Sequence, residues 1–419
     1  MKRIITFILL ILWGIFGLTL HASASGGPIG NRFTILNEAG LMEVNPAIAY
    51  NPHRQEYLTV WYNDRPGNDD IRGQRIAWDG RRIGGGFYIA AGAGAERRFP
   101  DVAYSTQDHE YLVVWEQFNP ATGRYAIYGQ RISDYGNLIG TAFPIWNSAV
   151  SSRAPAIAYA STSNQFLIVW SWDSGGLMHI AGRTFSPSAG LGSFFYVFKD
   201  KVGSLHMNPD LAYNRARNEF LVVWQEYTAG WMKIQGVRVK MSGGAGVLGP
   251  YLAISSDVKG DMANPTVAAI PQPPGVGNYL VAWEDVTDAS DRDILARRVD
   301  GTGAMSASTY ALANSPWDES SPSLAGSEID SQFLAIWVWA PAPTPPAMME
   351  IQGMTIPMSI GLLWKKTIGG KQVLHTAVTT GPYGDFLIAF DDNAVAGVPE
   401  RGIYGWLWGK RLYLPILAK

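Results

Sequence analysis

A repeated segment with a period of about 54 residues constrains this chain more than any other feature. Each copy begins with a proline and apolar residues, crosses a short polar gap and reaches Tyr/Phe-Leu-x-Val-Trp or a variant; a segment similar to Ile-x-Gly-x-Arg follows. Six copies run 46–61, 100–115, 155–170, 209–224, 265–283 and 322–337, and a less regular seventh runs 376–390. Such a period indicates an array of structural units, so the fold must be derived from one unit.

Each copy contains short runs of β-branched and aromatic residues, separated by Gly, Asn, Asp and Pro. In the first copy these runs lie at 47–50, 57–61, 71–76 and 87–90. The pattern is typical of strands and turns rather than of helices. Four antiparallel strands, repeated radially, form a propeller blade that buries its faces against its neighbours. We therefore predict an all-β fold, a seven-bladed β-propeller of four-stranded antiparallel blades.

The two ends of the array predict how the ring closes. A run that resembles the fourth strand precedes the first proline, at 33–36, and the seventh copy has no clear fourth strand after residues 404–408. We expect the N-terminal strand to complete the last blade, because closure removes a free sheet edge. The C-terminal segment 411–417 is the alternative, although Pro415 makes it a poorer strand.

The N-terminus is typical of an export signal. Lys2 and Arg3 precede an apolar run at 4–20, and small residues follow at 22–24. We predict a signal peptide at 1–24, a propeller domain at 25–410 and a short apolar tail at 411–419. An uncleaved membrane anchor is the alternative for the first segment.

Composition narrows the compartment and the partners. The chain has no cysteine, which excludes disulfides and a lipidated cysteine, and loss of Lys2 and Arg3 leaves 31 basic against 35 acidic residues. A net charge of about −4 argues against nucleic acid or an anionic membrane as the main partner. We expect a bacterial protein that is secreted, extracellular or attached to the cell surface, monomeric, without a cofactor and without a membrane span after signal cleavage.

The repeats resemble those of a broad group of secreted bacterial β-propeller proteins to which no common reaction is attached. The resemblance rests on Pro-x-Ile/Val-Ala-Tyr, Tyr-Leu-Val-Val-Trp-Glu and Ile-x-Gly-Gln-Arg-Ile, and it covers nearly all of the mature chain. It implies the fold and export, and it implies no activity. The WD40 and sialidase signatures are absent from the sequence.

Repeated polar residues favour a structural role, because seven-fold repetition spreads them around a ring. Acids near the core aromatic are Asp64, Glu116, Asp173, Glu226, Glu284 and Asp391, and arginines close the following strand as Arg75, Arg131, Arg183, Arg238 and Arg298. We expect acid and arginine to pair and to hold each hairpin together.

Loops that differ between the repeats are the better candidates for a binding site, since a rigid scaffold commonly presents function on its loops. The loops between second and third strands share one face with those between blades, and we expect the site on that face and at the axial mouth. Their additional aromatic residues are Trp172, Trp231, Trp317, Trp339, Tyr62, Tyr227 and Phe118. Exposed rings of this kind suit stacking on sugars or on an apolar partner, and the alternative is that they fill gaps between loops.

Acidic residues supply two further hypotheses. Carboxylates that could bind calcium occur at Asp64, Asp69, Asp70, Asp285, Asp288 and Asp291, without the spacing of an EF-hand, so turn formation is the alternative. Asp101 and Asp210 follow the prolines of two first strands and could line the axial mouth. Paired carboxylates there could cleave glycosides if their separation suited the reaction.

Other chemistries find little support in the sequence. The five mature histidines have no metal-ligand spacing, and neither a Gly-x-Ser-x-Gly elbow nor a phosphate-binding loop occurs. The sequence therefore favours a non-catalytic binding or adhesion module for carbohydrate, another extracellular polymer or a surface protein. A polysaccharide hydrolase or lyase with acids at the axial mouth and a structural envelope protein are the alternatives.

Overall fold

The computed structural model describes residues 27–38, 40–65, 67–199, 203–242, 245–286, 291–341, 349–357, 363–369, 372–393 and 401–409. The predicted signal peptide 1–24 and the tail 411–419 lie outside the described residues. The described ranges contain strands and connections and no helix. They therefore include no helix that is long and apolar enough to cross a membrane.

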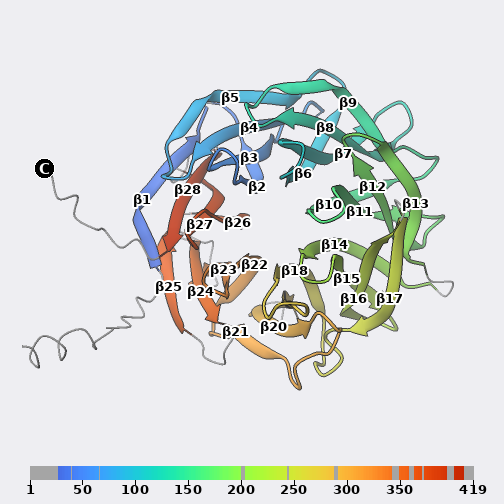
Figure 1. Ribbon diagram of the computed structural model, residues 1–419, viewed down its shortest axis with the longest axis vertical. Helices are drawn as coiled ribbons and strands as arrows, with labels where there is room; N and C mark the ends of the chain where they lie inside the picture. The colour runs from blue at the N-terminus through green and yellow to red at the C-terminus, as the bar shows by residue number, and fades with distance from the viewer. Residues whose placement is uncertain are drawn as a thin grey trace, which may run out of the picture.

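The strands are arranged around a common axis, and each belongs to one of four positions between the axis and the rim (Figure 1). The innermost strands are β2 (Glu43–Asn51), β6 (Glu96–Ser105), β10 (Ser152–Ala160), β14 (Leu205–Asn214), β18 (Met262–Ile270), β22 (Asp318–Ser327) and β26 (Thr376–Thr380). The second strands are β3 (Glu56–Asn63), β7 (Glu110–Asn119), β11 (Gln165–Asp173), β15 (Glu219–Thr228), β19 (Asn278–Asp285), β23 (Gln332–Ala340) and β27 (Phe386–Asn393).

The outer half of each unit follows the same order. The third strands are β4 (Asp70–Ala77), β8 (Arg124–Ser133), β12 (Met178–Ser186), β16 (Trp231–Ser242), β20 (Asp293–Asp300), β24 (Glu350–Pro357) and β28 (Arg401–Gly409). The outermost strands are β1 (Gly27–Leu36), β5 (Arg82–Ala90), β9 (Leu138–Trp146), β13 (Gly190–Phe198), β17 (Ala245–Ala253), β21 (Tyr310–Ala313) and β25 (Leu363–Gly369).

Consecutive strands pair antiparallel within each repeat, which gives the sheets β2 to β5, β6 to β9, β18 to β21 and β22 to β25. The groups β10 to β13 and β14 to β17 are joined into one sheet by a single parallel bridge between Met178 and Leu205. We number these groups units 1 to 6 in chain order, and unit 7 contains β26, β27, β28 and β1. The radial arrangement of such sheets is that of a β-propeller.

The last sheet combines the two ends of the described chain. β1 pairs antiparallel with β28, from Gly27 with Gly409 to Leu36 with Ile403, with two register shifts along the way. The Trp406 indole N–H donates to the Gly30 carbonyl over 3.2 Å. In Figure 1 this N-terminal strand therefore lies at the rim beside β28.

The hydrophobic core lies between neighbouring units. The repeat tryptophans Trp61, Trp115, Trp170, Trp224, Trp283 and Trp337 are fully buried, and Phe390 takes the equivalent place in unit 7. Each apolar cluster combines two adjacent units, and one of them packs Leu387 and Ile403 of unit 7 against Trp61 of unit 1. The repeated glycines allow side chains of the same unit to pack closely over the third strand; a Cβ on Gly405, for example, would lie 2.5 Å from the Phe33 ring.

Candidate functional site

One residue from the same place in each unit, in or directly before the innermost strand, belongs to what we call the axial ring. In units 1 to 6 this residue precedes the repeat proline, at a point where a β-bulge shifts the register of the first hairpin. In unit 7 it is His375, since Thr376 pairs with Phe390, the counterpart of the repeat tryptophan. The axial ring consists of Asn45, Phe99, Ala154, Asn208, Asn264, Ser321 and His375.

The backbone of the axial ring is held in an unusual conformation. The first six members have φ angles from 48° to 55°. The proline that follows each of them disfavours the right-handed helical region, and the bulge places the residue in the left-handed region instead. Asparagine tolerates that region, whereas a bulky residue such as Phe99 is strained there. Strain of this kind persists only where the surroundings determine the conformation, and it gathers at functional sites.

Four members of the ring donate their backbone N–H groups to side chains of the preceding unit. The acceptor is the side chain that follows the core aromatic by one residue. The bonds run from Asn45 N to Asp391 Oδ2 (3.2 Å), Ala154 N to Glu116 Oε2 (2.8 Å), Asn264 N to Gln225 Oε1 (3.0 Å) and Ser321 N to Glu284 Oε1 (2.7 Å). Burial raises the pKa of Glu116 and of Glu284 despite these bonds. Each acceptor therefore joins two units and also holds a member of the ring.

Five adjacent positions of the ring, from unit 4 through unit 7 to unit 1, carry uncharged hydrogen-bonding side chains or the imidazole: Asn208, Asn264, Ser321, His375 and Asn45. We call them the polar arc. Asn208 and Asn264 are exposed, and Asn208 Nδ2 donates to Asn264 Oδ1 over 3.3 Å. The polar arc thus presents both donors and acceptors at the surface.

The imidazole of His375 is oriented by a buried carboxylate. Its Nδ1 lies 2.6 Å from Asp391 Oδ2, and Arg401 Nη1 donates to the other oxygen over 3.1 Å. Burial alone would raise the pKa of Asp391, but the hydrogen bond and charge of His375 and the charge of Arg401 outweigh it and lower that pKa. An ionised carboxylate only accepts, so Nδ1 carries the proton and Nε2 is left for a ligand.

The remaining positions of the ring, in units 2 and 3, are apolar. Phe99 is 43% exposed, and its ring centroid lies 5.9 Å from that of Tyr62 in unit 1. Ala154 follows it around the axis. The ring is therefore amphipathic, with an exposed aromatic face on one side and amide, hydroxyl and imidazole groups on the other.

The two predicted axial acids are Asp101 on β6 and Asp210 on β14. Each lies two residues after the ring member of its strand. Each carboxylate accepts two backbone N–H groups, and one of them comes from the next unit: Ile157 to Asp101 Oδ2 and Val267 to Asp210 Oδ2, both over 2.8 Å. Burial raises the pKa of Asp101 to about 7, and the nearby charge of Asp210 adds to the effect. Burial likewise raises the pKa of Asp210 to about 6. Both side chains remain partly exposed.

The predicted loop aromatics differ in how far they are exposed. Trp231, Tyr227 and Trp317 are exposed, by 53%, 43% and 37%. Trp172 and Trp339 are partly buried, and each donates its indole N–H to a serine hydroxyl over 3.4 Å, at Ser148 and Ser315 respectively. Tyr227 and Trp231 belong to unit 4 and Trp172 to unit 3, whereas Trp339 lies in unit 6 and Trp317 directly precedes its first strand.

The expected exposure is wrong for Tyr62, which is only 8% exposed. It lies in β3 directly after Trp61 and packs into the cluster between units 1 and 2. Burial raises its pKa to about 12. Phe118, by contrast, remains partly exposed at the end of β7 and packs against Tyr125.

The carboxylates of the first group of calcium candidates contact arginine side chains. Asp69 accepts from Arg98 Nε, Asp64 lies 3.9 Å from Arg98, and Asp70 lies 3.6 Å from Arg97. Cationic guanidinium groups therefore take the place that a metal ion would need.

The second group of candidates lies in unit 5. Asp285 and Asp291 are partly exposed near Asp293, whose pKa burial and their two charges raise to about 6, and Asp288 lies outside the described residues. Within the described ranges, no group of three or more His, Asp or Glu side chains is placed to hold a metal ion.

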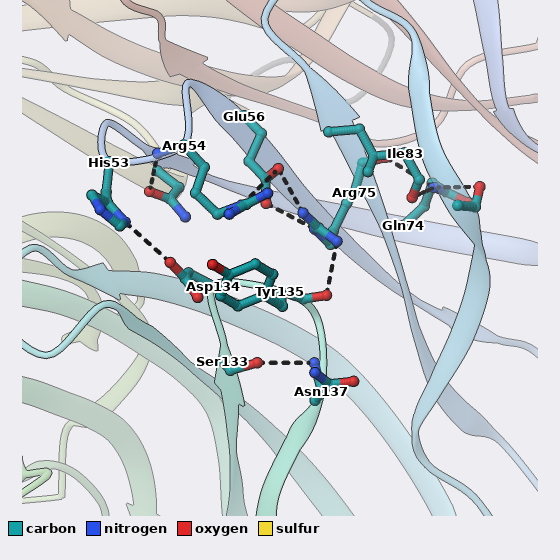
Figure 2. Close-up of polar contacts among 12 residues, drawn as sticks. His53, Arg54, Glu56, Gln74, Arg75, Ile83, Ser133, Asp134, Tyr135 and Asn137 are labelled. Carbon is teal, nitrogen blue, oxygen red and sulfur yellow. Dashed lines mark hydrogen bonds and ion pairs between the residues drawn. The ribbon is translucent and has the colours of Figure 1, made fainter.

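At the opposite ends of the strands, an ion pair of glutamate and arginine links the second and third strands, and Figure 2 shows the copy in unit 1. Arg75 donates from Nε and Nη2 to both oxygens of Glu56 over 2.8 Å, and from Nη1 to the Tyr135 carbonyl of unit 2 over 2.8 Å. Arg131 with Glu110 and Arg238 with Glu219 repeat the pair.

The prediction that these arginines pair with the acid after the core aromatic is wrong. An antiparallel hairpin places the end of its second strand beside the start of the third, far from the closing arginine. For Arg75, Arg131 and Arg238 the partner is instead the glutamate that begins the second strand. Arg183 and Arg298 donate to backbone carbonyls, Arg183 to that of Gly192 and Arg298 to that of Pro357. The acid after the aromatic, such as Glu116, serves the axial ring of the next unit.

His53 and His109 lie in turns on this opposite face. Their rings stack with centroids 4.0 Å apart, across the boundary between units 1 and 2. His53 Nδ1 lies 3.1 Å from Asp134, a contact that Figure 2 also draws. This geometry fits a structural contact between turns.

Sequence reasoning missed the axial ring. His375 was considered only as one of the histidines without metal-ligand spacing, and Phe99 was not singled out. A signal was present, because the ring residue always precedes the first-strand proline or its equivalent, and its identity varies while the surrounding residues repeat. Variation within an otherwise regular repeat was the informative feature.

Comparisons with known proteins identify the fold. No family model matches the chain, and no curated protein matches it. Among solved structures, a protein of unknown function from Dyadobacter fermentans is similar over 93% of this chain and 100% of its own, at 10% identity and a TM-score of 0.58. The β-propeller domain of the trilobed protease from Pyrococcus furiosus matches 92% of this chain and 99% of its own, at 8% identity and a TM-score of 0.50.

A fungal alcohol oxidase of the AA5 family, solved with copper, is also similar, over 91% of this chain and 76% of its own, at 10% identity and a TM-score of 0.54. At such identities the likeness concerns the fold alone. The class that fold and comparisons define is therefore an all-β propeller.

Proposed function

We propose that this chain is an exported, monomeric β-propeller that binds a carbohydrate polymer at the axial ring without cleaving it. The amphipathic character of the ring is the observation that carries the proposal. Sugars have apolar C–H faces and hydroxyl edges, and they therefore suit a site with an aromatic ring on one side and amides on the other.

The composition of the ring favours binding to uncharged groups of a ligand over binding to charged groups. Its members include no Lys, Arg, Asp or Glu, so recognition relies on hydrogen bonds and on stacking. Asn208, Asn264 and Phe99 are exposed and held on rigid strands, which reduces the entropy lost on binding. The strained backbone at Phe99 is consistent with selection for binding at that position.

We further propose that the seven units are seven blades of a ring that the N-terminal strand closes. Pairing of β1 with β28 supports this arrangement, as does the cluster in which Trp61 of unit 1 packs against Leu387 of unit 7. The proposed domain spans 25–410. Export through a signal peptide at 1–24 and a role of the tail 411–419 in surface attachment are proposals that rest on the sequence.

The test is retention of purified protein on a panel of insoluble and cross-linked polysaccharides, with soluble sugars measured in the same tubes. We expect retention without released oligosaccharides. The double variant Asn208→Ala/Asn264→Ala should be retained less, by about tenfold in affinity. Alanine suits this backbone, because Ala154 adopts the same φ of 50°.

A matched control lies on the opposite face. Asn218 has φ 50° and accepts a hydrogen bond from Tyr213, so Asn218→Ala makes a comparable change away from the ring. It should be retained like the wild type. Failure of the wild type to bind any polysaccharide would contradict the proposal.

A glycoside hydrolase or lyase is the second candidate, and the raised pKa values of Asp101 and Asp210, about 7 and 6, favour it. A carboxyl that stays protonated near neutral pH can act as a general acid. Both carboxylates, however, already hold two backbone N–H groups. Released oligosaccharides that disappear in Asp101→Asn would favour this candidate over binding alone.

A further inference from the structure

A second site on the same face lies beside the β7–β8 hairpin of unit 2. A hollow of about 100 Å³ opens there between this hairpin and the connections that precede β6 and β10. Pockets that enclose a whole small ligand are commonly several times larger, from about 300 Å³. The hollow therefore suits one group or one unit of a longer ligand that extends beyond it.

Two of the amides that line the hollow already use their oxygens as acceptors within the protein. The Trp115 indole, which can only donate, occupies Gln117 Oε1 over 3.3 Å. The backbone N–H of Ala121 likewise donates to Asn119 Oδ1 over 3.0 Å. Each side chain consequently turns its NH₂ group away from these partners, and Asn147 adds an exposed amide. The hollow is rich in hydrogen-bond donors.

Arg124 adds a positive charge. It is exposed, and it is the one charged side chain among the described residues that line the hollow. Within the described part of the chain, no carboxylate forms an ion pair with it, in contrast to the neighbouring arginines: Arg98 is paired with Asp69 and Glu96, Arg97 with Asp70, and Arg153 lies 3.9 Å from Glu116.

Aromatic rings complete the lining. Tyr128 is partly exposed and lies parallel to Trp115 with centroids 6.3 Å apart. Tyr125 lies beneath the guanidinium of Arg153, 3.8 Å from it, and this contact fixes the ring. An oxygen-rich anion on a flat, partly apolar unit would match the combination of rings, NH donors and one free guanidinium.

We propose that the hollow binds the carboxylate of an acidic sugar unit, with Arg124 as its principal partner, so that the polymer is an acidic polysaccharide. This inference rests on the proposed function and specifies its ligand. The axial ring contacts hydroxyl groups, and the hollow selects for the charge. Arginine presents two parallel N–H groups that fit the two oxygens of a carboxylate, with the Gln117 and Asn119 amides as further donors.

The experiment compares each acidic polysaccharide with its carboxyl-reduced form, in which the carboxylate becomes a hydroxymethyl group on the same backbone. The probes are polygalacturonate, alginate, hyaluronate and glucuronoxylan. We expect the wild type to bind at least one acidic form about tenfold more tightly than its reduced form. Arg124→Gln should abolish this preference, so that the acidic and the reduced form bind equally.

Matched variants isolate the role of the guanidinium. Arg124→Lys keeps the charge but loses the paired donors, so an intermediate preference is expected. Arg82→Gln removes an exposed arginine at the start of β5 on the opposite face, and it should keep the full preference. The thermal midpoints of all variants should match that of the wild type, because both arginines are exposed.

The outcomes separate the two proposals. Equal binding of acidic and reduced forms by the wild type, or an unchanged preference in Arg124→Gln, would overturn the acidic-sugar site and leave carbohydrate binding intact. Absence of binding to every polysaccharide, acidic or reduced, would overturn the proposed function and this inference with it.

Discussion

The two ends of the strands in this propeller have opposite characters. On the face opposite the loops, glutamate and arginine repeat the same ion pair, with Glu56 and Arg75 as its best-formed copy. At the axial ring, equivalent positions hold residues as different as Phe99, Asn264 and His375. The same ion pair therefore recurs at one end of the strands, in units 1, 2 and 4, whereas the ring residue at the other end varies between units.

This difference separates scaffold from site. The repeated pair, with its buried carboxylates Glu56, Glu110 and Glu219, contributes to the stability of units 1, 2 and 4. A varied ring held in strained conformations by repeated hydrogen bonds contributes little to stability and determines what the molecule can contact. Substitutions at the ion pairs should consequently lower stability, whereas substitutions at the axial ring should lower affinity for the ligand.

Removal of one member of a repeated ion pair should produce the largest effect. Glu56→Ala leaves the guanidinium of Arg75, which is 12% exposed, without its carboxylate. We expect a loss of about 3 kcal/mol in the free energy of unfolding, measured by urea denaturation, since breaking a buried pair is strongly destabilising. Polysaccharide binding by the folded protein should not change.

The exposed pair of Asp79 with Arg81, which is 77% exposed, is the control for that experiment. Asp79→Ala should lower the free energy of unfolding by less than about 1 kcal/mol. Equal losses in the two variants would remove the distinction between buried and exposed pairs on this face.

Replacement of Phe99 should have the reverse pattern. Phe99→Asn supplies the residue found at three other positions of the ring, and it tolerates the φ of 51°. We expect affinity for the retained polysaccharide to fall about tenfold, as stacking is lost, while the free energy of unfolding stays equal or rises by up to about 1 kcal/mol. Titration calorimetry and urea denaturation measure the two quantities.

Tyr135, which is 60% exposed on the opposite face, provides the matched aromatic control. Tyr135→Asn should leave the affinity unchanged. If both variants lost affinity to the same degree, the site would not be confined to the ring.

Asp101, two residues after the ring member Phe99, should have a smaller effect on stability, and this effect should depend on pH. Because burial raises the pKa of Asp101 to about 7, the folded state binds its proton more tightly than the unfolded state does, and this contribution to stability is lost as pH rises from about 4 to about 7. Asp101→Asn removes this dependence. The thermal midpoint of the variant relative to the wild type should therefore rise by roughly 2 °C between pH 5 and pH 8.

A constant difference between the two midpoints across that pH range would mean that Asp101 is ionised throughout in the folded protein. Its two backbone hydrogen bonds would then be the whole of its contribution.

The smallest effect is expected at Trp231, an exposed aromatic residue outside the ring. Trp231→Ala should change affinity by less than about twofold and should leave the thermal midpoint unchanged, since 53% of the side chain is exposed. A larger loss of affinity would extend the site from the axis to the β15–β16 hairpin.

The sequence predicted the scaffold well, because the repeat itself encodes it. The period, the strand pattern and the buried tryptophans such as Trp61 all indicated four-stranded units in a propeller. Register was harder: the acid after each tryptophan was assigned to an arginine of its own hairpin, although Glu116 and Glu284 bond to the next unit. Contacts between repeats leave no spacing signal within one repeat.

The site was predicted only in its location. The axial end and the loop face were named, but Tyr62 was expected to be exposed and is buried, because alternation along β3 does not reveal which neighbour covers a side chain. The ring depends on a bulge before each proline, and the hollow depends on the close approach of three segments. Neither the bulge nor that approach follows from local residue patterns.

The most direct test of the account is a crystal structure of the protein with an oligosaccharide prepared from the polysaccharide that retains it. We expect an ordered sugar unit over the axial ring, with its apolar face on Phe99 and its hydroxyl groups within hydrogen-bond distance of Asn208, Asn264 or His375. Sugar bound only on the face that carries the pair of Glu56 and Arg75 would contradict it.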